Sequence, residues 1–238
     1  RPNDGQMCGR YTLFTPAEEL AERFETATPD LEARYNCAPG QDLPVITDAN
    51  PDRFSRYEWG LVPEWADDGS NPPINARAET LTEKPTFAES VEHRRCLVPA
   101  DGFYEWVDRD AGKQPYRVAF EDDRPFAMAG LWSRWHPPTR QTGLSEFGGG
   151  GASDDPDPVD TFAIVTTEPN DLISDLHHRM AVVLDPSEEE TWLNGNLEDA
   201  LACCIPHPSA ELTAHPVSTR VNDPRNDDAS LVRATSEV

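Results

Sequence analysis

The cysteine at position 8 lies between a methionine and a glycine, in the segment Met7-Cys8-Gly9. Removal of Met7 as an initiator would leave Cys8 with a free α-amine as well as its thiol. An α-amine has a pKa of about 8, so a sizeable fraction is unprotonated at neutral pH and can attack an aldehyde. The thiolate can then close on the imine to form a five-membered thiazolidine. The alternative is that Cys8 is a small buried residue of a first strand, as free cysteines commonly are.

Thiol chemistry on a carbonyl also needs a group that moves protons near neutral pH, and histidine or a carboxylate can do so. Glu105 lies between two aromatic residues and is one candidate; the alternative is that it points to solvent from an alternating strand. His177 is the other candidate, but it adjoins His178, and two neighbouring histidines cannot both face one site. Either histidine could instead cap the end of a helix, where a cation is favoured.

Asn75 and Arg77 are two residues apart in a proline-containing segment. In an extended chain they face the same side, where an amide and a guanidinium can bind a phosphate or a carbonyl. The alternative is a hydrogen-bonded structural loop. Residue types alone therefore leave an enzyme resembling a cysteine protease and a binding module equally open.

Turn and periodicity signals predict the elements that must position these residues. Residues 15–18 form a capping box with proline at the first helical position, which predicts a short helix at about 16–26. Turn-forming residues predict loops at 34–40 and 71–80. Strands are predicted at residues 43–47, 54–61, 116–120, 126–131, 161–166, 182–184 and 211–217.

The segment 96–106 alternates around Asp101-Gly102, which predicts a tight hairpin. Asn170 and Asp185 can each cap a further short helix, and residues 197–204 can form another. Many short strands with hairpin turns and few helices predict an α+β fold. We expect a mainly antiparallel, barrel-like sheet with a few short flanking helices.

The length of 238 residues suits one large domain, which we expect at residues 8–226, and we expect a monomer. Residues 1–7 are interpreted as a leader or an expression remnant. Residues 227–238 are interpreted as a polar C-terminal tail. The segment at about 137–159 holds a run of four glycines with prolines and aspartates, which predicts a flexible insertion.

Acidic residues outnumber basic ones by 44 to 20, and Lys84 and Lys113 are the only lysines. Carboxylates spread along a lysine-poor chain indicate a halophilic surface. Such a net charge, −24, normally argues against nucleic-acid binding, because phosphates require a basic surface. The arginines that remain could still form a local positive groove.

Five cysteines, two of them adjacent, do not suggest a disulfide framework. No C-x-x-C occurs and the histidines lack zinc-finger spacing, so we expect no metal and no cofactor. No apolar run approaches the ~20 residues of a membrane span. These features predict a cytoplasmic protein that does not contact a membrane.

Seven segments, in order along the chain, resemble the SRAP family, also called SOS response-associated peptidases or abasic site processing proteins. They are Met7-Cys8-Gly9-Arg10, Tyr35-Asn36-Cys37-Ala38-Pro39-Gly40, Trp59-Gly60-Leu61-Val62-Pro63, Ile74-Asn75-Ala76-Arg77-Ala78-Glu79-Thr80, Arg95-Cys96-Leu97-Val98-Pro99-Ala100-Asp101-Gly102-Phe103-Tyr104-Glu105-Trp106, His177-His178-Arg179-Met180 and His215-Pro216-Val217-Ser218. No single segment is specific, but their combination is.

The resemblance implies that the N-terminal cysteine traps the ring-opened aldehyde of an abasic site in single-stranded DNA as a thiazolidine. This crosslink would protect the lesion in the DNA damage response. Cys8 would be the nucleophile, Asn75 would orient the amine or the sugar, and Glu105 and His177 would move protons. The same cysteine would remove the methionine that precedes it.

The resemblance also implies the DNA contacts. Arg10 and Arg77 match phosphate-binding positions, while Pro39 and Trp65 match residues near unstacked bases. Stacking holds a single strand without requiring a particular base sequence.

Three departures from the family pattern are visible. Six residues precede Met7, so Cys8 has a free amine only once they are removed, and Ala181 stands where the family usually has proline. The third is the insertion at about 137–159. Two other functions remain as alternatives. One is a thiol peptidase of the SOS response that acts on proteins, and the other is a non-catalytic binder of single-stranded DNA.

Overall fold

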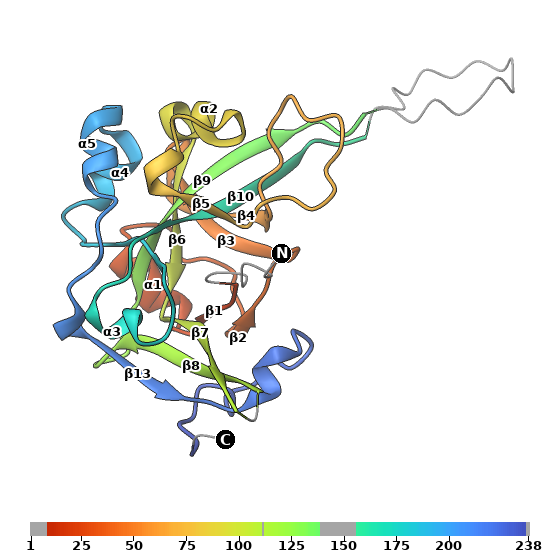
Figure 1. The fold of residues 1–238 in the computed structure, drawn as a ribbon. Helices are drawn as coiled ribbons and strands as arrows, with labels where there is room; N and C mark the ends of the chain where they lie inside the picture. The colour runs from red at the N-terminus through yellow and green to blue at the C-terminus, as the bar shows by residue number, and fades with distance from the viewer. Residues whose placement is uncertain (1–8, 111, 139–155, 237–238) are drawn as a thin grey trace, which may run out of the picture.

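The computed structural model describes residues 9–110, 112–138 and 156–236. At its centre five strands form a closed barrel in the order β10-β4-β3-β6-β9, because β9 also pairs with β10 (Figure 1). The strands are β3 (Asp42–Thr47), β4 (Asn50–Trp59), β6 (Arg95–Ala100), β9 (Phe126–Trp135) and β10 (Val159–Thr167). The pairings are antiparallel except that of β4 with β10. The expected α+β fold with a barrel-like, mainly antiparallel sheet is confirmed.

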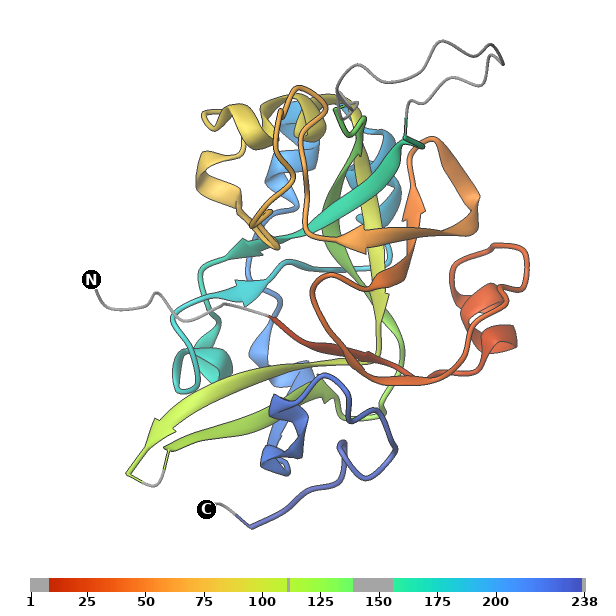
Figure 2. The same ribbon diagram turned by 90° about the vertical axis from the view of Figure 1, so that its right-hand side faces the viewer.

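A second, antiparallel sheet lies at one end of the barrel (Figures 1 and 2). Its order is β13 (Leu212–Pro216), β8 (Gly112–Phe120), β7 (Gly102–Arg109), β1 (Tyr11–Leu13) and β2 (Arg34–Cys37). Buried Tyr11 and Val118 of this sheet belong to the same apolar cluster as Trp59 and Phe162 of the barrel. The two sheets therefore share one hydrophobic core.

Short elements complete the described chain. The short strands are β5 (Asn75–Arg77), β11 (Met180–Ala181) and β12 (Val183–Leu184). The helices are α1 (Ala17–Arg23), α2 (Pro85–His93), α3 (Asp171–Ser174), α4 (Glu189–Asn194) and α5 (Leu197–Ala202), with 3₁₀ turns η1 (Ala78–Thr80), η2 (Ser209–Glu211) and η3 (Thr219–Asn222). Among the described residues, none of these helices has both the length and the apolar character that crossing a membrane requires.

The tight hairpin predicted at residues 96–106 is wrong, because the chain changes sheets at Asp101. β6 pairs with β3 and β9 in the barrel, whereas β7 pairs with β1 and β8 in the second sheet. A two-residue hairpin needs positive φ at its turn, and Gly102 is not among the described residues with positive φ. Glycine is needed at 102 for space, since a Cβ there would lie 2.7 Å from Arg117 Nε.

The predicted helix near residues 16–26 is present as α1, but the prediction of a capping box is wrong. The N-cap residue of α1 is Pro16, which has no side-chain cap. The Thr15 hydroxyl donates instead to Asp101 at 3.0 Å. The prediction that Asp185 caps a helix is wrong as well, because α4 begins only at Glu189 and its N-cap residue is Glu188. The Asn170 cap is confirmed, since its side chain accepts the Ile173 N–H.

Two predicted loops contain strands: residues 34–40 include β2, and residues 71–80 include β5. Both strands are short and pair with partners distant in sequence, so local turn signals did not predict them. Helix α2 was not predicted, although its proline at the first turn and buried Phe87 and Val91, four residues apart, are signals for it. Most of the insertion expected at 137–159 lies outside the described residues.

Candidate functional site

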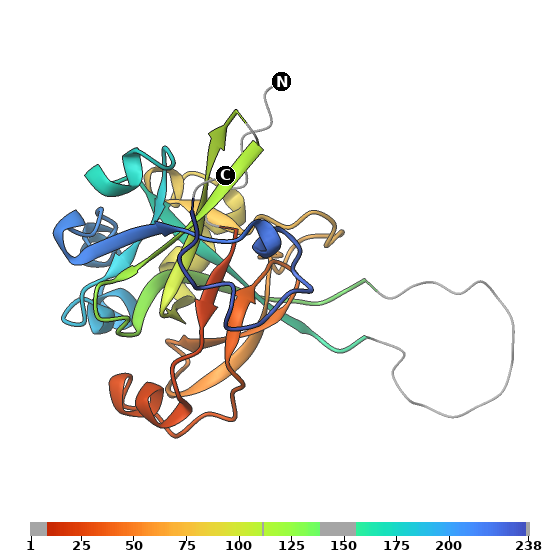
Figure 3. The ribbon, with the colours of Figure 1, turned by 90° about the horizontal axis from the view of Figure 1, so that it is seen from below.

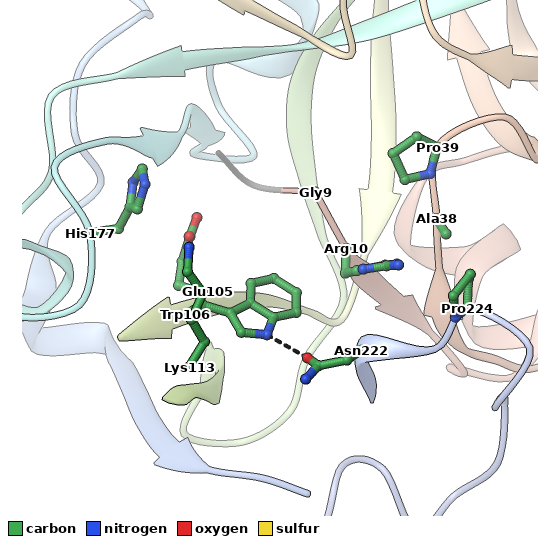
Figure 4. Close-up of a pocket in the computed structure, with 10 residues that line it drawn as sticks. All are labelled: Gly9, Arg10, Ala38, Pro39, Glu105, Trp106, Lys113, His177, Asn222 and Pro224. Atoms are coloured by element: carbon green, nitrogen blue, oxygen red, sulfur yellow. Dashed lines mark hydrogen bonds between the residues drawn. The ribbon is translucent and has the colours of Figure 1, made fainter. Parts of the chain in front are cut away.

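A pocket of about 420 Å³ opens where the chain enters β1. Its lining consists of Gly9, Arg10, Ala38, Pro39, Glu105, Trp106, Lys113, His177, Asn222 and Pro224. We call it the Glu105 pocket. In Figure 4, Trp106 separates Arg10 on one side from Glu105, Lys113 and His177 on the other. Four predicted site residues, Arg10, Pro39, Glu105 and His177, therefore meet in one pocket.

The pairing of β1 with β7 positions Glu105 beside the start of β1. Tyr104 donates its backbone N–H to the carbonyl of Arg10 at 3.0 Å, and Tyr11 pairs with Phe103. Glu105 is 1% exposed, so the alternative of a solvent-facing side chain is wrong. A buried carboxylate that lines a pocket can exchange protons with a bound molecule.

His177 follows α3, and its backbone N–H donates to the carbonyl of Ile173 at 2.7 Å. The side chain is half-buried, with Nδ1 3.2 Å from the backbone nitrogen of Arg179. Burial and, secondarily, repulsion from the adjacent His178 lower the pKa of His177 below its ordinary value of 6.5. The lowered pKa favours the neutral ring. Nδ1 also lies 3.3 Å from the carbonyl oxygen of Arg179, so the tautomer with its proton on Nδ1 has an acceptor there and leaves Nε2 able to accept a proton from a bound molecule.

Arg10 supplies a cation to the opposite side of the Glu105 pocket. Burial lowers the pKa of its guanidinium, and Asp223 opposes that effect. Its Nε is buried without a hydrogen-bond partner among the described residues. Ala38 and Pro39 line the pocket beside Arg10. The chain turns after them at Gly40, whose φ of +77° favours glycine. A guanidinium with unused donor capacity is suited to bind an anion.

The C-terminal segment forms another wall of the pocket through Asn222 and Pro224. Trp106 donates its indole N–H to Asn222 at 2.8 Å (Figure 4). The Asn36 amide nitrogen lies within 3.2 Å of the carbonyl oxygens of residues 221, 223 and 226. Seen from below, this segment crosses beside β1 and β2 (Figure 3).

These wall residues were not predicted as site residues, because the bonds from Asn36 to backbone carbonyls that position them have no sequence signature. Residues expected to form a polar tail continue this packing: Asp227 accepts the backbone N–H groups of Tyr35 and Asn36, and Leu231 is buried.

Asn75, Arg77 and Trp65 are not among the residues that line the Glu105 pocket in the described chain. Asn75 and Arg77 lie in β5, paired with β10. The Asn75 Nδ2 atom is buried without a hydrogen-bond partner among the described residues, and Arg77 is exposed. Trp65 is 59% exposed. Cys8 lies outside the described residues.

The cysteines and possible metal ligands that the structure describes lie outside the lining of the Glu105 pocket, apart from Glu105 and His177. The described cysteines, Cys37, Cys96, Cys203 and Cys204, are free and buried. Burial raises the pKa of the thiols of Cys96 and Cys204, the latter to about 12, so they are poor nucleophiles at neutral pH. Within the described ranges, no group of three or more His, Cys, Asp or Glu side chains could hold a metal ion.

The fold and chain were compared with known proteins. A crystal structure of a protein from Bacteroides thetaiotaomicron superimposes with a TM-score of 0.81 at 27% identity, covering 96% of this chain and 100% of that one. The family model described as SOS response associated peptidase (SRAP) matches residues 7–224. The fold of this chain is thus shared with a solved structure, and its sequence matches one family over most of its length.

The curated relatives of this chain support the family match. The chain is 36% identical to abasic site processing protein YoqW of Bacillus subtilis (strain 168), covering 96% of this chain and 100% of the relative. It is 30% identical to abasic site processing protein YedK of Escherichia coli (strain K12), covering 95% and 99%. It is 32% identical to abasic site processing protein HMCES of Gallus gallus, covering 93% and 76%. The chain belongs to the SRAP family.

Proposed function

We propose that this protein processes abasic sites by linking Cys8 covalently to the lesion in single-stranded DNA. The observation that carries the proposal is that Gly9, the residue after Cys8, lines the same pocket as Glu105 and His177. Cys8 is bonded directly to Gly9, and consecutive Cα atoms are about 3.8 Å apart, which supports Cys8 as the nucleophile for this pocket. The names of the relatives, abasic site processing proteins, support the substrate class.

The reaction begins with the ring-closed abasic sugar, whose hemiacetal opens to an aldehyde when its hydroxyl proton is removed and its ring oxygen is protonated. The free amine of Cys8 adds to the aldehyde carbon, and loss of water gives an imine. The thiolate then adds to the imine carbon, and the nitrogen takes up a proton. The net change joins one aldehyde to one aminothiol and releases one water.

Glu105 and His177 move the protons of these steps. The neutral imidazole of His177 can accept a proton at physiological pH, and the Glu105 carboxylate can accept one and return it to the departing water. Asn75 orients the amine or the sugar, for which its buried Nδ2, without a partner in the part of the chain that the structure describes, provides a donor.

The single-stranded DNA is held by ionic contacts to its phosphates and by stacking on its bases. Arg10 and Arg77 bind phosphates, and Pro39 and Trp65 contact unstacked bases. The net charge of −24 weakens attraction for DNA, and high salt weakens it further. A thiazolidine, once closed, does not depend on that attraction.

The free amine requires removal of everything before Cys8. We propose that the protein hydrolyses its own Met7–Cys8 bond, with the Cys8 thiol as nucleophile. One water is consumed, and the products are a peptide that ends in Met7 and a chain that begins at Cys8. This step accounts for the peptidase in the family description.

The test is incubation of protein beginning at Cys8 with an oligonucleotide that carries one abasic site. The expected result is a heat-stable shift of the DNA band that Cys8→Ala abolishes. Glu105→Gln should slow its formation by roughly 10²–10⁴-fold, the usual contribution of a general acid or base. Absence of the shift in the parent protein would refute the proposal.

Two other outcomes would favour the alternative functions. Cleavage before Cys8 without DNA reactivity would favour a thiol peptidase, and mass spectrometry of the N-terminus detects it. Equal binding of unmodified and abasic strands by Cys8→Ala, with no crosslink in the parent, would favour a non-catalytic binder.

A further inference from the structure

Lys113 lies at the junction of two pockets. Lys84 and Lys113 are the only lysines of a chain with 44 acidic residues, and Lys113 lines the Glu105 pocket. It also lines an adjoining pocket of about 380 Å³, together with Trp106 and His177. Because these three residues border both pockets, the two pockets are neighbours, and Glu105 lines the first of them.

The ammonium group of Lys113 is exposed and forms no ion pair with the residues that the structure describes. Many arginines of this acidic protein are ion-paired, as Arg34 is with Asp227 and Arg179 with Glu79. Asp108 is the cross-strand neighbour of Lys113, yet across residues 9–110, 112–138 and 156–236 no carboxylate lies within 4.0 Å of the ammonium. A cation kept free of carboxylates in such a chain is available to an anionic ligand.

The distribution of charge selects the position of that ligand. Arg10 and Lys113 lie on opposite sides of Trp106 in Figure 4, so the Glu105 pocket carries two cations around its single described carboxylate. Asp108, opposite Lys113 on the paired strand, and Asp175 line the adjoining pocket and repel an anion there. The favourable position for a phosphate is therefore on the side of Lys113 that faces the Glu105 pocket.

We propose that Lys113 binds a backbone phosphate of the DNA strand on the His177 side of the abasic sugar, while Arg10 holds the strand on the other side. The inference rests on the proposed function and adds a contact to it. A lysine ammonium binds phosphate as a compact point charge, and neutralisation of one phosphate makes affinity dependent on salt.

The first test measures equilibrium binding of an oligonucleotide that carries a tetrahydrofuran abasic analogue, which has no aldehyde and cannot crosslink. Lys113→Gln should weaken binding about tenfold, as expected for loss of one hydrogen bond between charged groups. The slope of log Kd against log salt concentration should fall by about 0.7, the value for one phosphate contact in a single strand. Lys113→Arg should retain most of the affinity and the slope.

Lys84→Gln is the matched control. Lys84 is exposed and precedes α2, at the end of the molecule opposite β7 and β8 (Figure 1). Its replacement removes the same charge from the protein and should leave affinity and slope unchanged. Equal weakening by Lys113→Gln and Lys84→Gln would overturn the inference, because it would indicate a general effect of net charge.

A second test uses the presence of only two lysines. Acetylation with an amine-reactive ester, followed by mass spectrometry, should show protection of Lys113 and not of Lys84 when the DNA is bound. If the parent protein binds the oligonucleotide but Lys113 is neither protected nor required, this inference fails and the proposed function stands. If the parent protein binds no single strand, both fail.

Discussion

The hydroxyl of Thr12 donates a 2.6 Å hydrogen bond to the carboxylate of Asp101, 89 residues later in the chain. The same carboxylate accepts the backbone N–H groups of Phe14 and Thr15. One side chain thus fixes β1, which follows Gly9 and Arg10, to the corner that precedes β7 and Glu105. The position of the pocket relative to the N-terminal end of the domain depends on this contact.

Replacement of Asp101 by alanine should destabilise the protein by about 3 kcal/mol, because it leaves several buried donors without an acceptor. Burial raises the pKa of Asp101, and the hydrogen bonds from Thr12, Thr15 and Phe14 oppose that effect. Urea unfolding measures the loss. Asp122→Ala, which removes an exposed carboxylate, is the control and should cost less than about 0.5 kcal/mol. Equal costs would contradict the anchoring role.

Asp101 also illustrates why the sequence predicted the strands better than their pairing. Alternating apolar residues on both sides of Asp101-Gly102 predict two strands, and β6 and β7 are both present. The same pattern is compatible with a hairpin and with a corner between two sheets. Long-range contacts favour the corner over the hairpin. Thr12 of β1 donates to the Asp101 side chain, and the guanidinium of Arg117 donates to the Asp101 carbonyl.

The site residues that belong to short sequence motifs were predictable from the sequence. Arg10, Pro39, Glu105 and His177 come from four distant motifs, and their meeting in one pocket could be expected only from the family resemblance. The wall formed by residues 222–224 could not be predicted in this way. Its position depends on bonds from the Asn36 amide to backbone carbonyls, which have no sequence signature.

The reaction should be limited at acid pH by protonation of His177. Burial and the charge of His178 hold the pKa of His177 below 6.5, so the neutral, proton-accepting form persists to a lower pH than in an exposed histidine. His178→Ala removes the repulsion, so it should raise the pKa of His177 and move the acid limb of the crosslinking rate to higher pH. NMR titration of the ring protons reports the pKa directly. A shift in the opposite direction would contradict this assignment.

The same shift predicts how stability depends on pH. Because the folded state disfavours protonated His177, its pKa is lower folded than unfolded. The stability it contributes is complete above the unfolded value of about 6.5 and is lost as pH falls through the window between the unfolded and folded values. Urea unfolding at several pH values should show less of this loss in His178→Ala.

Asn36→Ala should release the wall of the Glu105 pocket. Asn36 is fully buried, and its amide nitrogen bonds carbonyl groups of the segment that carries Asn222 and Pro224. The expected loss is about 2–3 kcal/mol in urea unfolding, together with slower crosslinking at temperatures where the protein stays folded. Asn194→Ala is the control, because its amide makes one exposed bond to Glu190. Normal crosslinking by folded Asn36→Ala would show that this wall has no role in the reaction.

Trp65→Ala should separate DNA binding from stability. Trp65 and Ile205 are the exposed large hydrophobic residues of the described chain, at 59% and 57%. Truncation of either exposed side chain should change the free energy of unfolding by less than about 0.5 kcal/mol. If Trp65 stacks on an unpaired base, its loss should weaken binding of the tetrahydrofuran oligonucleotide by roughly 1–3 kcal/mol, whereas Ile205→Ala should bind normally. Fluorescence anisotropy of the labelled strand measures both, and equal affinities of the two variants would exclude a stacking role for Trp65.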